Sequence, residues 1–161
     1  MRPVVVAGIG QKLRGDDGAG LEAVSAWASE YPGTAWSGDV RVEIRELPGL
    51  ELLEALAGCE AAVVVDAVRS SGAAPGAVHL LEEGDVHAFG PAASTAHGWG
   101  VEETLALGRR IGSSGLPSRV ILIGIEAGRL EMGEGLSRPV KEALPRVTRL
   151  IQEQVERLLK S

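Results

Sequence analysis

Three short runs of the chain are apolar at almost every position, and this feature constrains the fold most strongly. They are residues 3–9 (PVVVAGI), 61–66 (AAVVVD) and 119–125 (RVILIGI). A strand with one face in water alternates apolar and polar residues, whereas an unbroken apolar run indicates a strand that is buried on both faces. Amphipathic segments separate the runs, so we expect a mostly parallel sheet with helices covering both of its faces.

The remaining segments complete this architecture. The alternation in residues 40–46 (VRVEIRE) predicts a strand nearer an edge, and residues 77–81 predict a further short strand. Helices are predicted at residues 18–29, 50–57, 100–110 and 139–159, and a long loop at residues 84–98, which are rich in glycine, alanine and proline. The predicted fold class is therefore α/β: residues 1–161 form a single domain, a three-layer αβα sandwich with a mostly parallel sheet of five or six strands.

Composition and charge limit the partners of this chain. The net charge is −6, which argues against a nucleic acid or an anionic membrane as partner, because both require basic surfaces. The N-terminal apolar run is too short for a signal peptide, and no run approaches the roughly 18 residues that span a bilayer. Cys59 is the only cysteine, so no intrachain disulfide can form. We expect a cytoplasmic monomer.

The glycine-rich turn after the first apolar run carries two adjacent acids, Asp16 and Asp17, in the stretch GIGQKLRGDDGAG. A dinucleotide site is disfavoured, because Leu13 stands at the third glycine position of G-x-G-x-x-G and the acids would repel a pyrophosphate. An acid before a helix commonly caps its N-terminus, and we expect this role for Asp16. On that basis Asp16→Asn should retain most activity, since asparagine caps nearly as well as aspartate.

Two further residues could share a site with Asp17. Asp66 ends the second apolar run, and His97 lies in the loop before the helix predicted at residues 100–110. Ligands of open α/β sheets bind beyond the carboxyl ends of the strands, so these three side chains meet if the first two apolar strands are neighbours.

Two carboxylates and an imidazole suit a divalent cation, whereas two carboxylates alone can share a proton in acid–base catalysis. Purely structural roles compete with both: Asp66 could form a turn, and a histidine in a glycine-rich loop often has no chemical role. We assign His79 and His87 to the surface or to packing.

Three motifs, in one order and at similar spacing, resemble the hydrogenase maturation proteases. They are GIGQKLRGDDGAG, the strand-ending VVVDAV of residues 63–68, and STAHGWGVEETLALGRR of residues 94–110. Those endopeptidases remove a C-terminal extension from the large subunit of nickel–iron hydrogenases after nickel has been inserted. The resemblance implies that Asp17, Asp66 and His97 contact nickel, that Asp17 and Asp66 are also the catalytic acids, and that the metal belongs to the large-subunit precursor, the expected partner.

One departure from the family pattern bears on recognition. RELPGLELL, residues 45–53, stands where the family commonly has a D-G-G-T segment, and we expect it to alter which large subunit is recognised. The chain lacks a G-x-S-x-G elbow, a Cys–His pair and an H-E-x-x-H helix, which disfavours covalent catalysis and the usual zinc protease chemistry. Two alternatives stay open: a nickel-reading assembly factor that does not cut, and a different peptidase or small hydrolase on the same scaffold.

Overall fold

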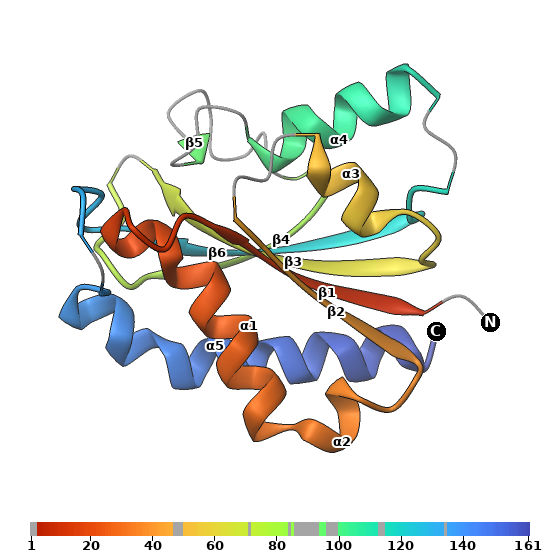
Figure 1. Ribbon diagram of the computed structural model, residues 1–161, viewed down its shortest axis with the longest axis horizontal. Coiled ribbons are helices and arrows are strands. Elements are labelled where there is room, and N and C mark those ends of the chain that lie inside the picture. The colour runs from red at the N-terminus through yellow and green to blue at the C-terminus, as the bar shows by residue number, and fades with distance from the viewer. Residues whose placement is uncertain are drawn as a thin grey trace.

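The protein forms one six-stranded sheet between two layers of helices, as the computed structural model in Figure 1 shows. The structure describes residues 3–46, 50–70, 72–83, 85, 94–95, 100–112, 115–133 and 135–161. The strands are β1 (Val4–Gly10), β2 (Val40–Glu46), β3 (Ala61–Arg69), β4 (Val78–Glu82), β5 (Ser94–Thr95) and β6 (Arg119–Glu126). Their order is β2-β1-β3-β6-β4, with β5 paired to β3; β4 and β5 are antiparallel and the other pairings are parallel. The predicted α/β sandwich is confirmed, and β2 lies at an edge as expected.

The helices divide between the two faces of the sheet. They are α1 (Ala19–Glu30), α2 (Pro32–Ala35), α3 (Glu51–Leu56), α4 (Val101–Arg110) and α5 (Arg138–Leu159), with a 3₁₀ turn, η1 (Gly15–Gly18), before α1. In Figure 1, α1, α2 and α5 cover one face, and α3 and α4 cover the other. Among the described helices, none is long and apolar enough to cross a membrane.

Both faces of the central strands are buried, which explains the unbroken apolar runs. In β1, Val4 and Val6 pack in the cluster with α1 and α5, whereas Val5 and Ala7 pack in the cluster with α3 and α4. Trp27, fully buried in the first cluster, donates its indole N–H to Gln152 Oε1 at 3.0 Å, so its polar atom is satisfied.

The strand that carries Asp66 is longer than the sequence predicted. β3 continues to Arg69, because β6 offers it backbone partners up to the pairing of Val68 with Glu126. The pairing of β1 with β3 stops at Val65, which leaves the far end of β3 open to the short strand β5. Asp66 therefore lies inside a strand, directly after the last residue of β3 that pairs with β1, and not at the strand terminus. Most of the loop predicted at residues 84–98 lies outside the described residues.

Candidate active site

Asp17 and Asp66 lie in neighbouring segments at the carboxyl end of the sheet. β1 and β3 are adjacent and parallel, as the site prediction required. The start of α1 lies close against β3 because Gly20 has no side chain: a Cβ there would stand 2.3 Å from the carbonyl oxygen of Val65, the residue before Asp66. Asp17 is fully buried and Asp66 is 4% exposed. By the alternation of β3, Asp66 faces the α3 and α4 side of the sheet.

The shape of the turn that carries Asp17 depends on Gly10. This residue has a φ of +150°, and a Cβ on it would lie 2.0 Å from the backbone oxygen of Asp17. The neighbouring Gln11 N–H donates to that same oxygen at 3.3 Å. The chain therefore folds back directly after β1, which holds Asp17 against the end of that strand.

The carboxylate of Asp16 binds the loop between β6 and α5, so the capping role predicted for it is wrong. Neither η1 nor α1 has a side-chain cap. Oδ2 accepts the N–H groups of Gly128 and Arg129, each at 2.8 Å, and the hydroxyl of Ser137 at 2.7 Å. Oδ1 accepts the N–H of Ser137 at 2.6 Å. Asp16 does not cap the helix, because these donors together satisfy both oxygens of its fully buried carboxylate.

Burial would raise the pKa of Asp16, but the hydrogen bonds from Ser137, Arg129 and Gly128 outweigh it, so the pKa lies below its ordinary value of 3.8. Asp16 is therefore an ionised structural group that ties the η1 turn to the loop between β6 and α5.

The third predicted member of the site, His97, lies outside the described residues, as do His87 and Trp99. Within the described part of the chain, no group of three or more His, Cys, Asp or Glu side chains is placed to hold a metal ion. The grouping of Asp17, Asp66 and His97 therefore stays a prediction, now resting on the adjacency of β1 and β3.

A further buried acid, Glu126, lies at the same end of the sheet and was not predicted. Glu126, the last residue of β6, is 2% exposed and accepts a hydrogen bond from the backbone N–H of Ser70 at 3.0 Å. The Ser70 hydroxyl also donates to it, and His79 Nε2 lies 3.1 Å from its Oε1. His79, for which the sequence predicts a place at the surface or in packing, is thus a partner of a buried acid. The available signal was that Glu126 ends the run RVILIGIE, much as Asp66 follows AAVVV.

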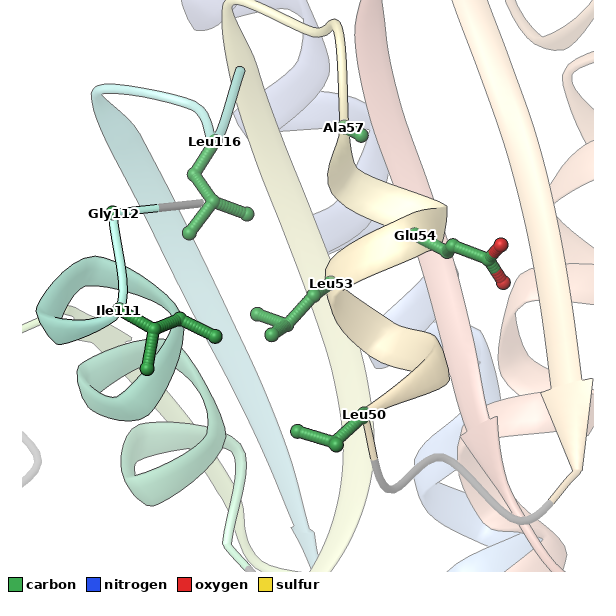
Figure 2. Close-up of a pocket in the computed structure, with 7 residues that line it drawn as sticks. All are labelled: Leu50, Leu53, Glu54, Ala57, Ile111, Gly112 and Leu116. Atoms are coloured by element: carbon green, nitrogen blue, oxygen red, sulfur yellow. The ribbon is translucent and has the colours of Figure 1, made fainter. Parts of the chain in front are cut away.

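An apolar groove lies on the face that α3 and α4 cover, and it holds no catalytic group. Its lining residues are Leu50, Leu53, Glu54, Ala57, Ile111, Gly112 and Leu116. Figure 2 shows Leu53 from α3 and Ile111 from the end of α4 pointing toward one another across it, while Glu54 points away. Leu50 and Ile111 are 58% and 64% exposed. Such a groove suits binding to a protein surface better than chemistry.

Solved structures share this fold along nearly its whole length. A hydrogenase maturating endopeptidase HybD from Escherichia coli matches with a TM-score of 0.75 and 24% identity, over 96% of this chain and 93% of that one. The [NiFe] hydrogenase maturation protease HybD from Thermococcus kodakarensis matches with a TM-score of 0.73 and 23% identity, over 95% and 99% of the two chains. This chain therefore shares its αβα fold with these two peptidases.

The sequence itself assigns the family. The family model described as "Hydrogenase maturation protease" matches residues 47–154, a stretch that includes Asp66 and His97. A "Hydrogenase expression/formation protein HupD" from Thiocapsa roseopersicina is 31% identical over 157 residues, which cover 96% of this chain and 67% of that protein. The hydrogenase 2 maturation protease of Escherichia coli is 29% identical over 88% of this chain and 82% of its own length. The chain belongs to the hydrogenase maturation protease family and is a peptide-bond hydrolase.

Proposed function

We propose that this protein removes a C-terminal extension from the large-subunit precursor of a nickel–iron hydrogenase after nickel has been inserted. Membership of the maturation protease family supports the reaction class and the kind of substrate. The observation that carries the proposal is the burial of Asp17 in the turn after β1, and of Asp66 near the carboxyl end of β3, the parallel strand adjacent to β1. This is the edge at which α/β sheets bind their ligands. We expect the reaction to take place in the cytoplasm, with the protease acting as a monomer.

In this proposal Asp17, Asp66 and His97 engage the nickel ion of the substrate. Carboxylate oxygens and an imidazole nitrogen are ligands that a divalent transition metal accepts. The metal belongs to the precursor, so its presence both anchors the scissile bond near the acids and reports that maturation has reached this step. A precursor without nickel would bind poorly, so the irreversible cleavage would follow nickel insertion.

Hydrolysis then needs an activated water molecule. Either one of the two carboxylates accepts its proton, or the nickel ion of the substrate polarises it. The oxygen of this water adds to the peptide carbonyl carbon, the C–N bond breaks, and the proton passes to the departing amine. Both routes require the charge of Asp66.

The direct test follows the mass of a purified nickel-loaded large-subunit precursor after incubation with the protein. The wild-type protein should release one C-terminal fragment of defined mass. Asp66→Asn keeps the size of the side chain and removes its charge, so it should cut at least about a hundredfold more slowly, with an unchanged circular dichroism spectrum. Asp39→Asn, at an exposed acid, is the matched control and should cut like the wild type.

Two results would contradict the proposal. A nickel-dependent complex that never loses its C-terminus would favour the assembly-factor alternative for this substrate. Equal cleavage by Asp66→Asn and the wild type would place the catalytic acid elsewhere.

A further inference from the structure

The strand that carries Asp66 loses one of its neighbours at that residue. β3 pairs with β1 only as far as Val65, whereas it pairs with β6 as far as Val68, which lies opposite Glu126. Asp66 itself lies opposite Gly124 of β6. Within the described part of the sheet, the end of β3 is therefore held by β6 on one side and by the two-residue strand β5 on the other. The placement of the Asp66 carboxylate then depends on how firmly this end is attached to β6.

The carboxylate of Glu126 extends that attachment beyond the last strand pair. Its Oε2 accepts the backbone N–H of Ser70 at 3.0 Å, and its Oε1 accepts the hydroxyl of the same residue. His79 Nε2, from β4, lies 3.1 Å from Oε1. The backbone of Glu126 takes part as well: its N–H donates to Ala77 O and its oxygen accepts the N–H of Gly76, both at 2.8 Å. Glu126 thus joins the end of β3, the turn that follows it, and β4.

Glu126 and Asp66 project from the same face of the sheet. Ile125 belongs to the core cluster with α1 and α5, so the alternation of β6 turns its neighbour Glu126 to the α3 and α4 side, as it does Asp66 in β3. Gly124, opposite Asp66, has no side chain, and Val68 packs over it: a Cβ on Gly124 would lie 3.0 Å from Val68 Cγ2. This contact fixes β3 against β6 directly beside Asp66.

The surroundings of Glu126 suit a structural anchor better than a group that acts on the substrate. Its side chain is 2% exposed, and Ser70 donates a hydrogen bond to each of its oxygens. A buried carboxylate with such partners fixes the geometry around it, because leaving the donors unsatisfied costs free energy.

We propose that Glu126 is a positioning residue for Asp66: its carboxylate fixes the end of β3 and so holds the Asp66 carboxylate in the orientation that cleavage needs. The inference rests on the proposed function, and it adds to it a residue that does not touch the substrate. A displacement of about 1 Å at a reacting group can cost about a hundredfold in rate. Loosening the end of β3 should therefore act mainly on kcat, since parts of the precursor away from the scissile bond also contribute to its binding.

The kinetic test uses the nickel-loaded large-subunit precursor. Glu126→Ala removes the carboxylate and should lower kcat at least about tenfold, with KM within about threefold of the wild type. Glu126→Gln can accept the Ser70 N–H with its oxygen and donate its NH₂ to the Ser70 hydroxyl and to a neutral His79, so kcat should stay within about twofold. Ser70→Ala removes the hydroxyl alone and should lower kcat about fivefold; it decides the question if Glu126→Ala does not fold.

A matched variant separates positioning from general stability. Val155 is fully buried near the end of α5, which Figure 1 shows at the opposite end of the molecule from the carboxyl ends of β1 and β3. Val155→Ala leaves a cavity and should destabilise the fold, yet keep kcat within about twofold when assayed at a temperature where it is fully folded.

Amide hydrogen exchange measures the positioning without any cleavage. The backbone amides of residues 66–70 should exchange at least about tenfold faster in Glu126→Ala than in the wild type, and at the wild-type rate in Glu126→Gln.

The outcomes separate this proposal from the proposed function. If the wild type cuts the precursor and Glu126→Ala keeps its kcat, or Val155→Ala loses as much, the positioning role is overturned and the proposed function stands. An equal loss in Glu126→Gln and Glu126→Ala also overturns it, because the charge and not the hydrogen-bonded geometry would then matter. If the wild type does not cut the precursor, the proposed function fails and exchange alone decides: faster exchange in Glu126→Ala supports the positioning role, and unchanged exchange overturns it.

Discussion

Asp16 and Asp17 are adjacent and both fully buried, yet only the surroundings of Asp16 assign it a structural role. The sequence could not reveal this, because its hydrogen-bond partners lie far along the chain: Gly128 is 112 residues away and Ser137 is 121. Local pattern alone favoured a helix cap, which is what an acid in that position most often does. The family resemblance distinguished the roles of the two acids only in that it implies a metal contact for Asp17.

The hydrogen bonds of Asp16 reverse our expectation for Asp16→Asn. An asparagine amide offers one acceptor oxygen, and its NH₂ group would face N–H donors that the second carboxylate oxygen now accepts. We predict a loss of about 2–4 kcal/mol in the free energy of unfolding, measured by urea denaturation. Asp39→Asn, at an exposed acid, should change it by no more than about 0.5 kcal/mol. A stable Asp16→Asn variant would contradict the assigned role.

The lowered pKa of Asp16 predicts a pH dependence of stability. The folded protein binds this proton less readily than the unfolded chain, whose carboxyl titrates near 3.8. The stabilisation by Asp16 is therefore complete above that value and declines as the pH falls through the lower pKa of the folded state. The difference in unfolding free energy between the wild type and Asp16→Asn should be constant from pH 5 to 7 and shrink below about pH 4. If the difference in unfolding free energy instead grew as the pH fell, the predicted direction of the pH dependence would be wrong.

At the scale of elements, the central strands and the four longer helices were predictable, whereas α2, β5 and the pairings of the strands were not. The apolar runs gave β1, β3 and β6 because a strand buried on both faces has few other sequence patterns. The extra length of β3 depends on β6 beside it, which no local pattern encodes. The same holds for β4, whose antiparallel direction beside β6 follows from the chain path and not from residues 78–82.

The packing of α1 on β3 gives a prediction at this scale. Gly20→Ala would place a Cβ 2.3 Å from Val65 O and 2.6 Å from Ile9 O, both backbone atoms, so α1 must move away from the sheet. We expect a loss of about 2–3 kcal/mol in unfolding free energy, and slower cleavage because α1 begins just after Asp17. Gly33→Ala, where a Cβ would meet nothing within 4 Å, is the control and should be neutral in both measurements. Equal stability of the two variants would contradict the packing described.

For the whole molecule, the fold class followed from the sequence, whereas the groove between α3 and α4 did not. Leu50, Leu53 and Leu116 line it from segments that only the folded chain brings together. Residues 47–49 of the divergent stretch RELPGLELL lie outside the described residues, and Leu50 and Leu53 of that stretch line the groove. This supports the expectation that the stretch takes part in choosing the partner.

Replacing residues 47–50 with the corresponding segment of a relative should therefore change which precursor is cut. Cleavage rates on the precursors of two different hydrogenases, measured with the wild type and the chimera, give the comparison. The preference should shift toward the precursor of the donor enzyme by about tenfold, while nickel dependence is kept because Asp17 and Asp66 are untouched. If the chimera keeps the selectivity of the wild type, residues 47–50 do not take part in choosing the partner.

The central claim is that the protease reads the metal of its substrate before it cuts. The most direct measurement compares one large-subunit precursor in its nickel-loaded and nickel-free forms, with the mass of the precursor followed over time for the wild type and for Asp66→Asn. The account predicts that the wild type releases the C-terminal fragment from the nickel-loaded form alone, and that Asp66→Asn releases it from neither. Cleavage of both forms at equal rates by the wild type would contradict it.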